Sequence, residues 1–185
     1  VQDSYTDFAI AYSPEMVEGL TLGYATADQE TAINKSVTKT TGYAKYAVGG
    51  LTIGYQVSEA DHDTKTSSAD SHGYGVTYAV NDDLSVHAGY DMYGENGFYL
   101  ESGSFGDMWG SGMEYSTFTY EGTDMSFGGS YSMGDFVLGA TMHTITSEDE
   151  TVDYSVTDFS LGYTLSDNSS VSMNYASTDR SGEDD

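Results

Sequence analysis

Alternation of apolar and polar residues is the feature that most restricts how this chain can fold. In residues 51–58 every second residue is apolar: Leu51, Ile53, Tyr55 and Val57. The same alternation recurs in 74–80, 84–92 and 158–165. Successive side chains of a β-strand point to opposite faces of the sheet. Each segment is therefore predicted to be a strand with one apolar face and one polar face.

A repeated hairpin unit joins these strands. In each of four copies a tyrosine stands three residues before a short polar or glycine-containing turn, and another alternating segment follows. The copies begin at Tyr46, Tyr78, Tyr131 and Tyr163. Turns at 49–50 and 134–135 suit two-residue hairpins, because glycine adopts a positive φ without strain. A fifth hairpin, which runs from Tyr12 to Leu20 through Pro14, has a longer turn.

The spacing of the repeat favours a membrane barrel over other repeat folds. Tyr46 and Tyr78 are 32 residues apart, and so are Tyr131 and Tyr163. Each period holds two strands, whereas a propeller blade needs four. One connection in each period is short and the other is long and variable. Short turns at one end and long loops at the other are typical of transmembrane barrels.

The two faces of the predicted strands also distinguish a barrel from a soluble sandwich, whose core-facing strands alternate in the same way. The polar face is rich in Gly, Ser, Thr and Ala, which suit a concave wall better than a solvated surface. The repeated tyrosines stand at one level on the apolar face, as expected of an aromatic girdle at a membrane–water boundary. The predicted girdle consists of Tyr12, Tyr46, Tyr78, Tyr131 and Tyr163.

We therefore predict an all-β fold, an antiparallel up-and-down transmembrane β-barrel, with residues 1–185 in one domain. About ten strands are expected, each near the length of roughly 9–11 residues that a tilted strand needs to cross a bilayer. They span 4–12, 20–27, 41–48, 51–58, 72–80, 84–93, 123–133, 136–144, 156–165 and 170–178.

Charge excludes several classes of function. The chain has 5 basic and 30 acidic residues, a formal net charge of −25. Nucleic acid is excluded as a partner, because phosphate binding requires clustered Lys and Arg.

None of the four histidines stands in an HExxH or nucleophile-elbow motif, so no catalytic site is predicted. No apolar run approaches 18 residues, so no transmembrane helix is predicted.

The hairpin units resemble those of the general porins of Gram-negative outer membranes, and so does the segment Met16-Val-Glu-Gly-Leu-Thr-Leu-Gly-Tyr24. The resemblance extends over nearly the whole chain. It implies a water-filled channel for passive diffusion of small hydrophilic solutes in the cell outer membrane, without enzymatic activity. It also implies contact with membrane lipid and lipopolysaccharide, and a homotrimer.

The number of strands is a point of difference from that family, whose barrels have 16 or 18 strands and end on an aromatic strand. The last residues of this chain, Asp179–Asp185, instead look like the start of an external loop. The expectation is that the ten strands form part of a larger barrel, and the alternative is a complete ten-stranded barrel.

Polar residues on the face opposite the apolar one are the candidates for the wall of a channel. They are Lys45, Gln56, His87, Asp91, His143, Asp158 and Asn174. Lys45 is the single basic residue expected on this face. The acidic field of the chain is expected to favour cations over anions in the channel.

A long loop is expected over residues 94–122, because Tyr78 and Tyr131 are 53 residues apart, 21 more than the standard period. Loops of this length are usually functional. By analogy with porins the loop can fold inward as a constriction, with Glu95, Glu101 and Asp107 facing the pore. An external loop that clasps a neighbouring subunit is an equal alternative, and an additional pair of strands within 98–120 is another.

Two other loops are acidic, at residues 59–63 and 147–150. Carboxylates there can attract Ca²⁺ or Mg²⁺ diffusely, since hard cations take oxygen ligands. No spacing matches a specific metal site, and no cofactor is expected. Two other functions are kept as alternatives: a non-conducting outer-membrane barrel that acts as an adhesin or receptor, and a secreted calcium-binding β-sandwich.

Overall fold

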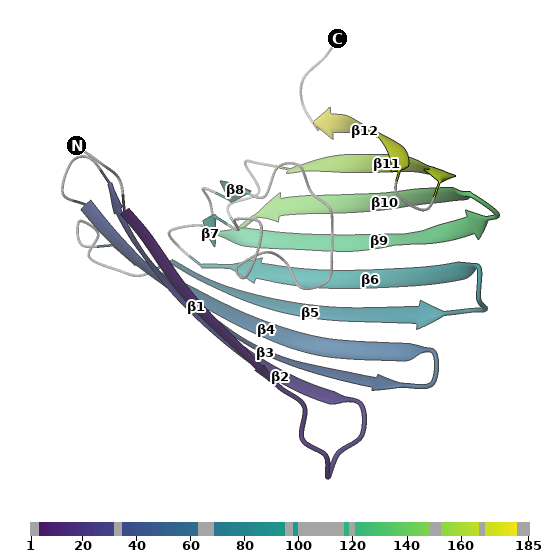
Figure 1. Ribbon diagram of the computed structural model, residues 1–185. Helices are drawn as coiled ribbons and strands as arrows, with labels where there is room; N and C mark the ends of the chain where they lie inside the picture. Colours follow the sequence, from purple (N-terminus) through teal and green to yellow (C-terminus); the bar gives the residue numbers. More distant parts are fainter. Residues whose placement is uncertain are drawn as a thin grey trace.

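Ten of the described strands form one antiparallel sheet in a computed structural model of the chain, and two short strands form a second, two-stranded sheet (Figure 1). The structure describes residues 4–31, 35–62, 69–94, 98–99, 117–118, 121–148, 153–166 and 169–180. The strands of the sheet are β1 (Ser4–Tyr12), β2 (Leu20–Thr31), β3 (Lys35–Val48), β4 (Leu51–His62), β5 (Ala69–Ala79), β6 (Leu84–Tyr93), β9 (Gly122–Met133), β10 (Phe136–Ser147), β11 (Asp153–Ser166) and β12 (Ser169–Arg180).

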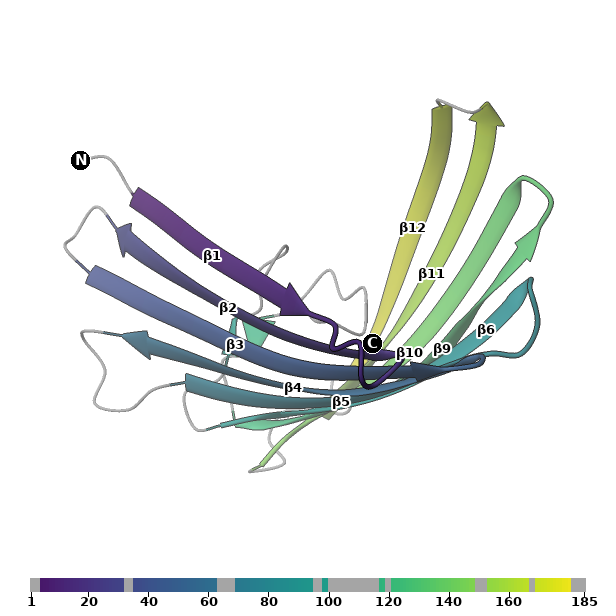
Figure 2. The same cartoon turned by 60° about the horizontal axis from the view of Figure 1, so that its bottom comes forward.

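The sheet has the predicted up-and-down order, because its ten strands lie side by side in the order in which they follow one another along the chain. It curves into a trough, with β1 and β12 at its two rims (Figure 2). Within the described residues, β1 pairs with β2 alone and β12 with β11 alone. The ten strands lie in one sheet and not in two packed sheets, so the alternative of a β-sandwich is wrong for the described residues.

The short turns at 49–50, 80–83 and 134–135 lie at one end of the trough, here called the turn end, together with the longer turn after β1; the end that holds the long segment between β6 and β9 is here called the loop end (Figure 1). The predicted glycine turns are confirmed: φ is 57° at Gly49 and 61° at Gly134. In the longer turn after β1, the amide of Val17 donates to the carbonyl of Pro14, and Gly19 adopts a φ of 84°.

Most strands run further toward the loop end than the sequence predicted. The largest difference is in β3, which begins at Lys35 and not at residue 41. Residues 35–40 are mostly Lys, Ser and Thr, so they carry little apolar signal although they pair fully with β2. Hydrogen bonding to a neighbouring strand therefore extends β3 beyond its apolar alternation.

Large apolar side chains lie exposed on the convex side, here called the outer face. Phe127 is 63% exposed and Tyr175 is 60% exposed, and Val76, placed on the apolar face by its alternation, is 37% exposed. Only small groups of apolar residues are buried among the described residues, such as Ile145 with Val156. A continuous exposed apolar surface of this kind is what a membrane-facing wall requires.

The stagger between strands gives the tilt of the sheet. Tyr12 pairs with Leu22, which pairs with Ala44, whereas the next repeat tyrosine, Tyr46, lies two residues closer to the turn end. The same two-residue step separates Tyr46 from Tyr78, Tyr78 from Tyr131 and Tyr131 from Tyr163. One residue of about 3.3 Å for each strand spacing of about 4.8 Å corresponds to a tilt of ~35°. Membrane barrels have tilts of this size, and in a sheet so tilted the five tyrosines share one height.

Candidate channel wall

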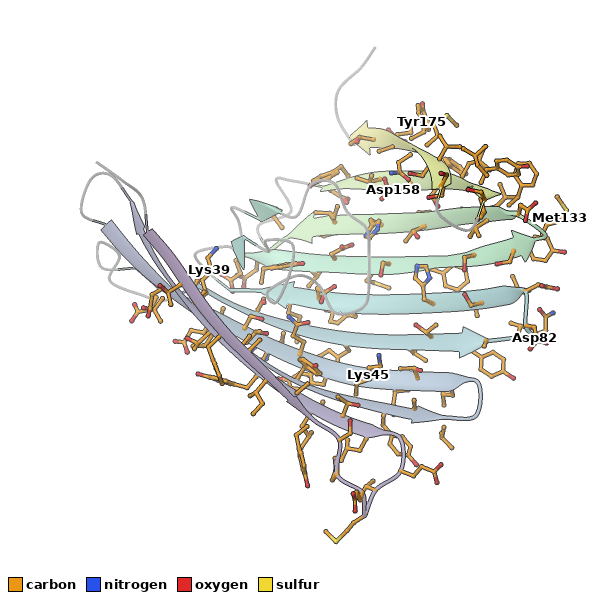
Figure 3. All side chains as sticks on the ribbon, in the orientation of Figure 1. Lys39, Lys45, Asp82, Met133, Asp158 and Tyr175 are labelled. Carbon is orange, nitrogen blue, oxygen red and sulfur yellow. The ribbon has the colours of Figure 1, made fainter. Side chains whose placement is uncertain are left out.

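The concave side of the trough, here called the inner face, is lined by polar and small residues. All seven wall candidates lie on it: Lys45, Gln56, His87, Asp91, His143, Asp158 and Asn174. Figure 3 shows Lys45 and Asp158 on the inside of the trough and Tyr175 on the outside. The alternation in the sequence therefore predicted the correct face for each of these residues.

Two further charged residues of the inner face were missed. Lys39 lies on the same face of β3 as Lys45 and is 6% exposed, so the prediction of a single inward basic residue is wrong. It was missed because the predicted strand began after it. Asp124 is 1% exposed and lies on the inner face of β9. Its neighbours Met125 and Phe127 point outward, and the predicted strand over 123–133 includes residue 124. The alternation therefore already indicated that Asp124 faces inward.

The charged residues meet around His143, at the centre of β10. Its Nδ1 atom lies 3.0 Å from Asp124 Oδ2 and 3.3 Å from Asp124 Oδ1. On the other side, its Nε2 atom lies 3.7 Å from Asp158 Oδ2. The imidazole is fully buried, and β9, β10 and β11 each contribute one member of this ion triad. Asp91 on β6 stands directly opposite Asp124 in the sheet register.

A second, uncharged network lies on β3 and β4. Gln56 Nε2 donates to Thr41 Oγ1 at 3.2 Å and to Ser58 Oγ at 3.3 Å. The hydroxyls of Thr41 and Ser58 are 2.7 Å apart. All three side chains are buried, which requires such pairing, since an unpaired buried polar group costs about 1–3 kcal/mol. Gln56 is thus part of a paired network and not an open lining residue.

The charged inner-face residues whose side chains the structure describes fall at two heights, measured toward the loop end from the level of the repeat tyrosines. Counted along its own strand toward the loop end, Lys39 lies seven residues from Tyr46 and Asp124 seven residues from Tyr131. Asp158 lies five residues from Tyr163 in the same direction. On β6 and β10 the stagger of one residue per strand places that level at Ser85 and Val137, so Asp91 and His143 both lie six residues above it. We call this set the charged level: Lys39, Asp91, Asp124, His143 and Asp158.

Lys45 and His87 lie below the charged level, one and two residues above the tyrosine level. His87 Nε2 is 3.2 Å from the hydroxyl of Thr141. The inner face is also more open here. Lys45 and Asn174 are exposed, whereas inner-face residues nearer the loop end, such as Thr41 and Ser71, are buried.

The remaining site predictions concern the long loop. Glu95, Glu101 and Asp107 lie outside the described residues. The alternative of a pair of strands within 98–120 is confirmed in short form, since β7 (Phe98–Tyr99) pairs with β8 (Thr117–Phe118). The described residues contain no group of His, Cys, Asp and Glu arranged to hold a metal ion. They also contain no helix that could span a membrane.

The outer face changes character near the loop end, where its apolar surface gives way to carboxylates. These are Asp28, Glu59, Asp61, Asp70, Asp153 and Asp179. Just below them, Tyr55 Oη lies 2.7 Å from His72 Nδ1, and His72 Nε2 lies 3.7 Å from Asp70 Oδ2. Between these carboxylates and the repeat tyrosines, the outer face of the described strands carries no Asp, Glu, Lys or Arg.

Solved structures of porins share this arrangement of strands. KdgM porin in complex with disordered oligogalacturonate is 13% identical, with a TM-score of 0.54 over 95% of this chain and 90% of that chain. A second structure of KdgM porin is 12% identical, with a TM-score of 0.54 over 95% of this chain and 89% of that chain. OpdK of Pseudomonas aeruginosa with vanillate is 15% identical, with a TM-score of 0.56 over 94% of this chain and 55% of that chain. The fold is that of an outer-membrane porin. No protein-family model and no curated protein matches the sequence.

Proposed function

We propose that the protein forms a water-filled channel in the outer membrane, through which small hydrophilic solutes diffuse passively. The observation that carries this proposal is the chemical difference between the two faces of one curved sheet. The outer face is apolar and exposed, whereas the inner face holds the charged and hydrogen-bonding side chains. In a bilayer this sheet turns its apolar side to lipid and surrounds water with its polar side.

The limits of the apolar surface support the membrane placement. Tyrosine is the residue that barrels favour at the membrane–water boundary, and the repeat tyrosines share one height on the tilted sheet. We propose this girdle for Tyr12, Tyr46, Tyr78, Tyr131 and Tyr163. We also propose that the outward carboxylates at the loop end face lipopolysaccharide phosphates, where diffuse Ca²⁺ or Mg²⁺ would bridge the two anionic groups.

The charge of the wall indicates the class of solute. KdgM was solved with oligogalacturonate and OpdK with vanillate, and both ligands carry carboxylates. Among the inner-face side chains that the structure describes, three carboxylates, those of Asp91, Asp124 and Asp158, stand against two lysines. The whole chain carries a net charge of −25. We therefore propose a preference for cationic and neutral solutes, because a wall of one sign concentrates ions of the opposite sign.

The resemblance to general porins suggests further properties that stay predictions. One is a homotrimer, and another is a ring of 16 or 18 strands of which this chain supplies ten. The third is that residues 94–122 narrow the channel, which rests on the length of that segment. Native mass spectrometry of the detergent-solubilised protein measures the subunit number directly.

Planar-bilayer recording tests the proposed function. Purified protein, whose folding is checked by the heat-dependent mobility of barrels on gels, is added to a bilayer between unequal KCl solutions. We expect open channels whose reversal potential has the sign of a cation preference. A folded sample that inserts without conducting would contradict the proposal and support the receptor alternative. A reversal potential of opposite sign would contradict the cation preference alone.

A further inference from the structure

His143 is held between two carboxylates that come from different strands. Its Nδ1 atom faces Asp124 on β9, at 3.0 Å, and its Nε2 atom faces Asp158 on β11, at 3.7 Å. The imidazole is 0% exposed and the Asp124 side chain is 2% exposed, whereas the Asp158 side chain keeps 23% of its surface exposed. The triad therefore reaches from the buried wall to the open interior of the trough.

The arrangement of acceptors determines how many protons the imidazole carries. A neutral imidazole has one N–H donor and one nitrogen with a lone pair, and an ionised carboxylate offers only lone pairs. A bare nitrogen directed at either carboxylate would place two lone pairs against each other in a buried site. With carboxylates on both sides, the matched form is the imidazolium, which donates from Nδ1 to Asp124 and turns its second N–H, on Nε2, toward Asp158 at ion-pair distance.

The other described neighbours leave this reasoning unchanged. Ser126 on β9 and Val156 on β11 stand directly opposite His143 in the register, and neither carries a charge. Thr141 and Ile145 flank it on the same face of its own strand. Asp91 on β6 stands beyond Asp124 and adds a third carboxylate to the same level. Among the described groups that face His143, Asp124 and Asp158 are the charged ones.

We propose that His143 is a specificity-determining residue of the channel, a fixed imidazolium that offsets one of the three carboxylates at the charged level. This inference rests on the proposed function, because selectivity has meaning only if the protein conducts. Counted over the side chains that the structure describes, the charged level holds Asp91, Asp124 and Asp158 against Lys39 and protonated His143, a net charge of −1. Loss of the imidazolium charge makes that level −2 and strengthens its attraction for cations.

The test compares permeability ratios of K⁺ to Cl⁻ at neutral pH in planar bilayers. We expect His143→Gln to raise the ratio about two- to fivefold, the effect of one unit charge acting across a few ångströms of partly screened solvent. The matched control is His72→Gln. His72 lies on the outer face of β5, opposite Val57, so its imidazole faces away from the interior of the trough and the ratio is expected to stay at the wild-type value.

A double variant separates charge from structure. In His143→Gln/Asp158→Asn the charged level returns to −1, so the permeability ratio is expected to return to the wild-type value. A purely structural role of His143 predicts no such restoration, because the second substitution removes a further polar contact. In the wild type, a rise of pH that removes one proton from the imidazolium is expected to move the permeability ratio toward that of His143→Gln. The permeability ratio of His143→Gln itself is expected to show no such change.

A spectroscopic measurement on the unmodified protein covers the case in which His143→Gln fails to fold. The ¹⁵N spectrum of histidine-labelled wild-type protein is expected to show one imidazole with both ring nitrogens protonated at neutral pH. A singly protonated His143 would overturn the inference, and so would a conducting His143→Gln with the wild-type ratio. If the wild type never conducts, the proposed function fails, while the imidazolium can still be observed in the ¹⁵N spectrum.

Discussion

The two faces of the sheet are made by the same strands, yet they depend on neighbours of different kinds. On the outer face, side chains such as Phe127 and Tyr175 are mostly exposed and so depend on the medium that surrounds the sheet. On the inner face, Asp124, His143 and Gln56 are buried and rely on one another. A buried polar group on the inner face thus requires a partner, whereas the charged groups of the outer face lie beyond its apolar surface. Four pairs of substitutions test the packing and polarity of the two faces.

The largest effect is expected on the inner face, from Asp124→Ala. This change leaves a buried imidazolium with one of its two carboxylates, and breaking a buried pair in this way costs about 3–5 kcal/mol. Urea unfolding of the protein in lipid vesicles, followed by far-UV circular dichroism, measures the change. The control is Asn174→Ala on the exposed part of the same face, for which less than ~0.5 kcal/mol is expected. Equal effects of the two substitutions would mean that the triad adds no stability.

The second effect is on the outer face, from Phe127→Arg. A charge that faces the middle of the bilayer costs about 2–4 kcal/mol in a membrane barrel. The same vesicle unfolding experiment measures this cost. In the control, Thr77→Arg, the new side chain enters the polar interior of the trough near Thr52 and His87. If Thr77→Arg proved the more damaging of the two, the assignment of the faces would be reversed.

A pair of glycines compares packing on the two faces. On the inner face the ring of Tyr43 covers Gly23, so a methyl group at position 23 would collide with it. We expect Gly23→Ala to cost about 1–3 kcal/mol, the usual effect of overpacking. On the outer face, a methyl group at Gly42 meets its nearest atom, a methyl of Val57, at 3.9 Å. Gly42→Ala is therefore expected to be neutral or to stabilise by about 0.5–1 kcal/mol in the same unfolding assay. Equal costs would show that the ring of Tyr43 does not lie on Gly23.

The smallest effect concerns the polar contact at the upper limit of the outer face. Tyr55→Phe removes the hydroxyl that lies 2.7 Å from His72 Nδ1, and a hydrogen bond of this kind contributes about 0.5–1.5 kcal/mol. Tyr74→Phe is the control, because it keeps the ring that packs against Tyr55 with centroids 4.9 Å apart. Thermal unfolding of both variants in the same lipid gives the comparison. A larger loss of stability for Tyr74→Phe than for Tyr55→Phe would show that the hydroxyl of Tyr55 is not the stabilising one.

Local alternation was sufficient to predict the strands, their order and the face of each wall candidate. The alternation failed where apolar residues stop, as at the start of β3 from Lys35 to Thr40, and Lys39 was therefore missed. The ion triad lay beyond sequence reasoning for a different reason. His143 meets Asp124 and Asp158 only because the registers of β9, β10 and β11 align across sequence separations of 19 and 15 residues. The alternation of a strand carries no information about its register.

The directions of the two rim strands have a consequence for how a ring can form. Nine antiparallel pairings lie between β1 and β12, so these strands run in opposite directions. Their free backbone edges are thus compatible with direct antiparallel bonding, and an odd number of intervening strands would force a parallel contact somewhere in the circle. Any ring completed from this arc by antiparallel pairing therefore contains an even number of strands, so that its diameter grows by whole hairpins.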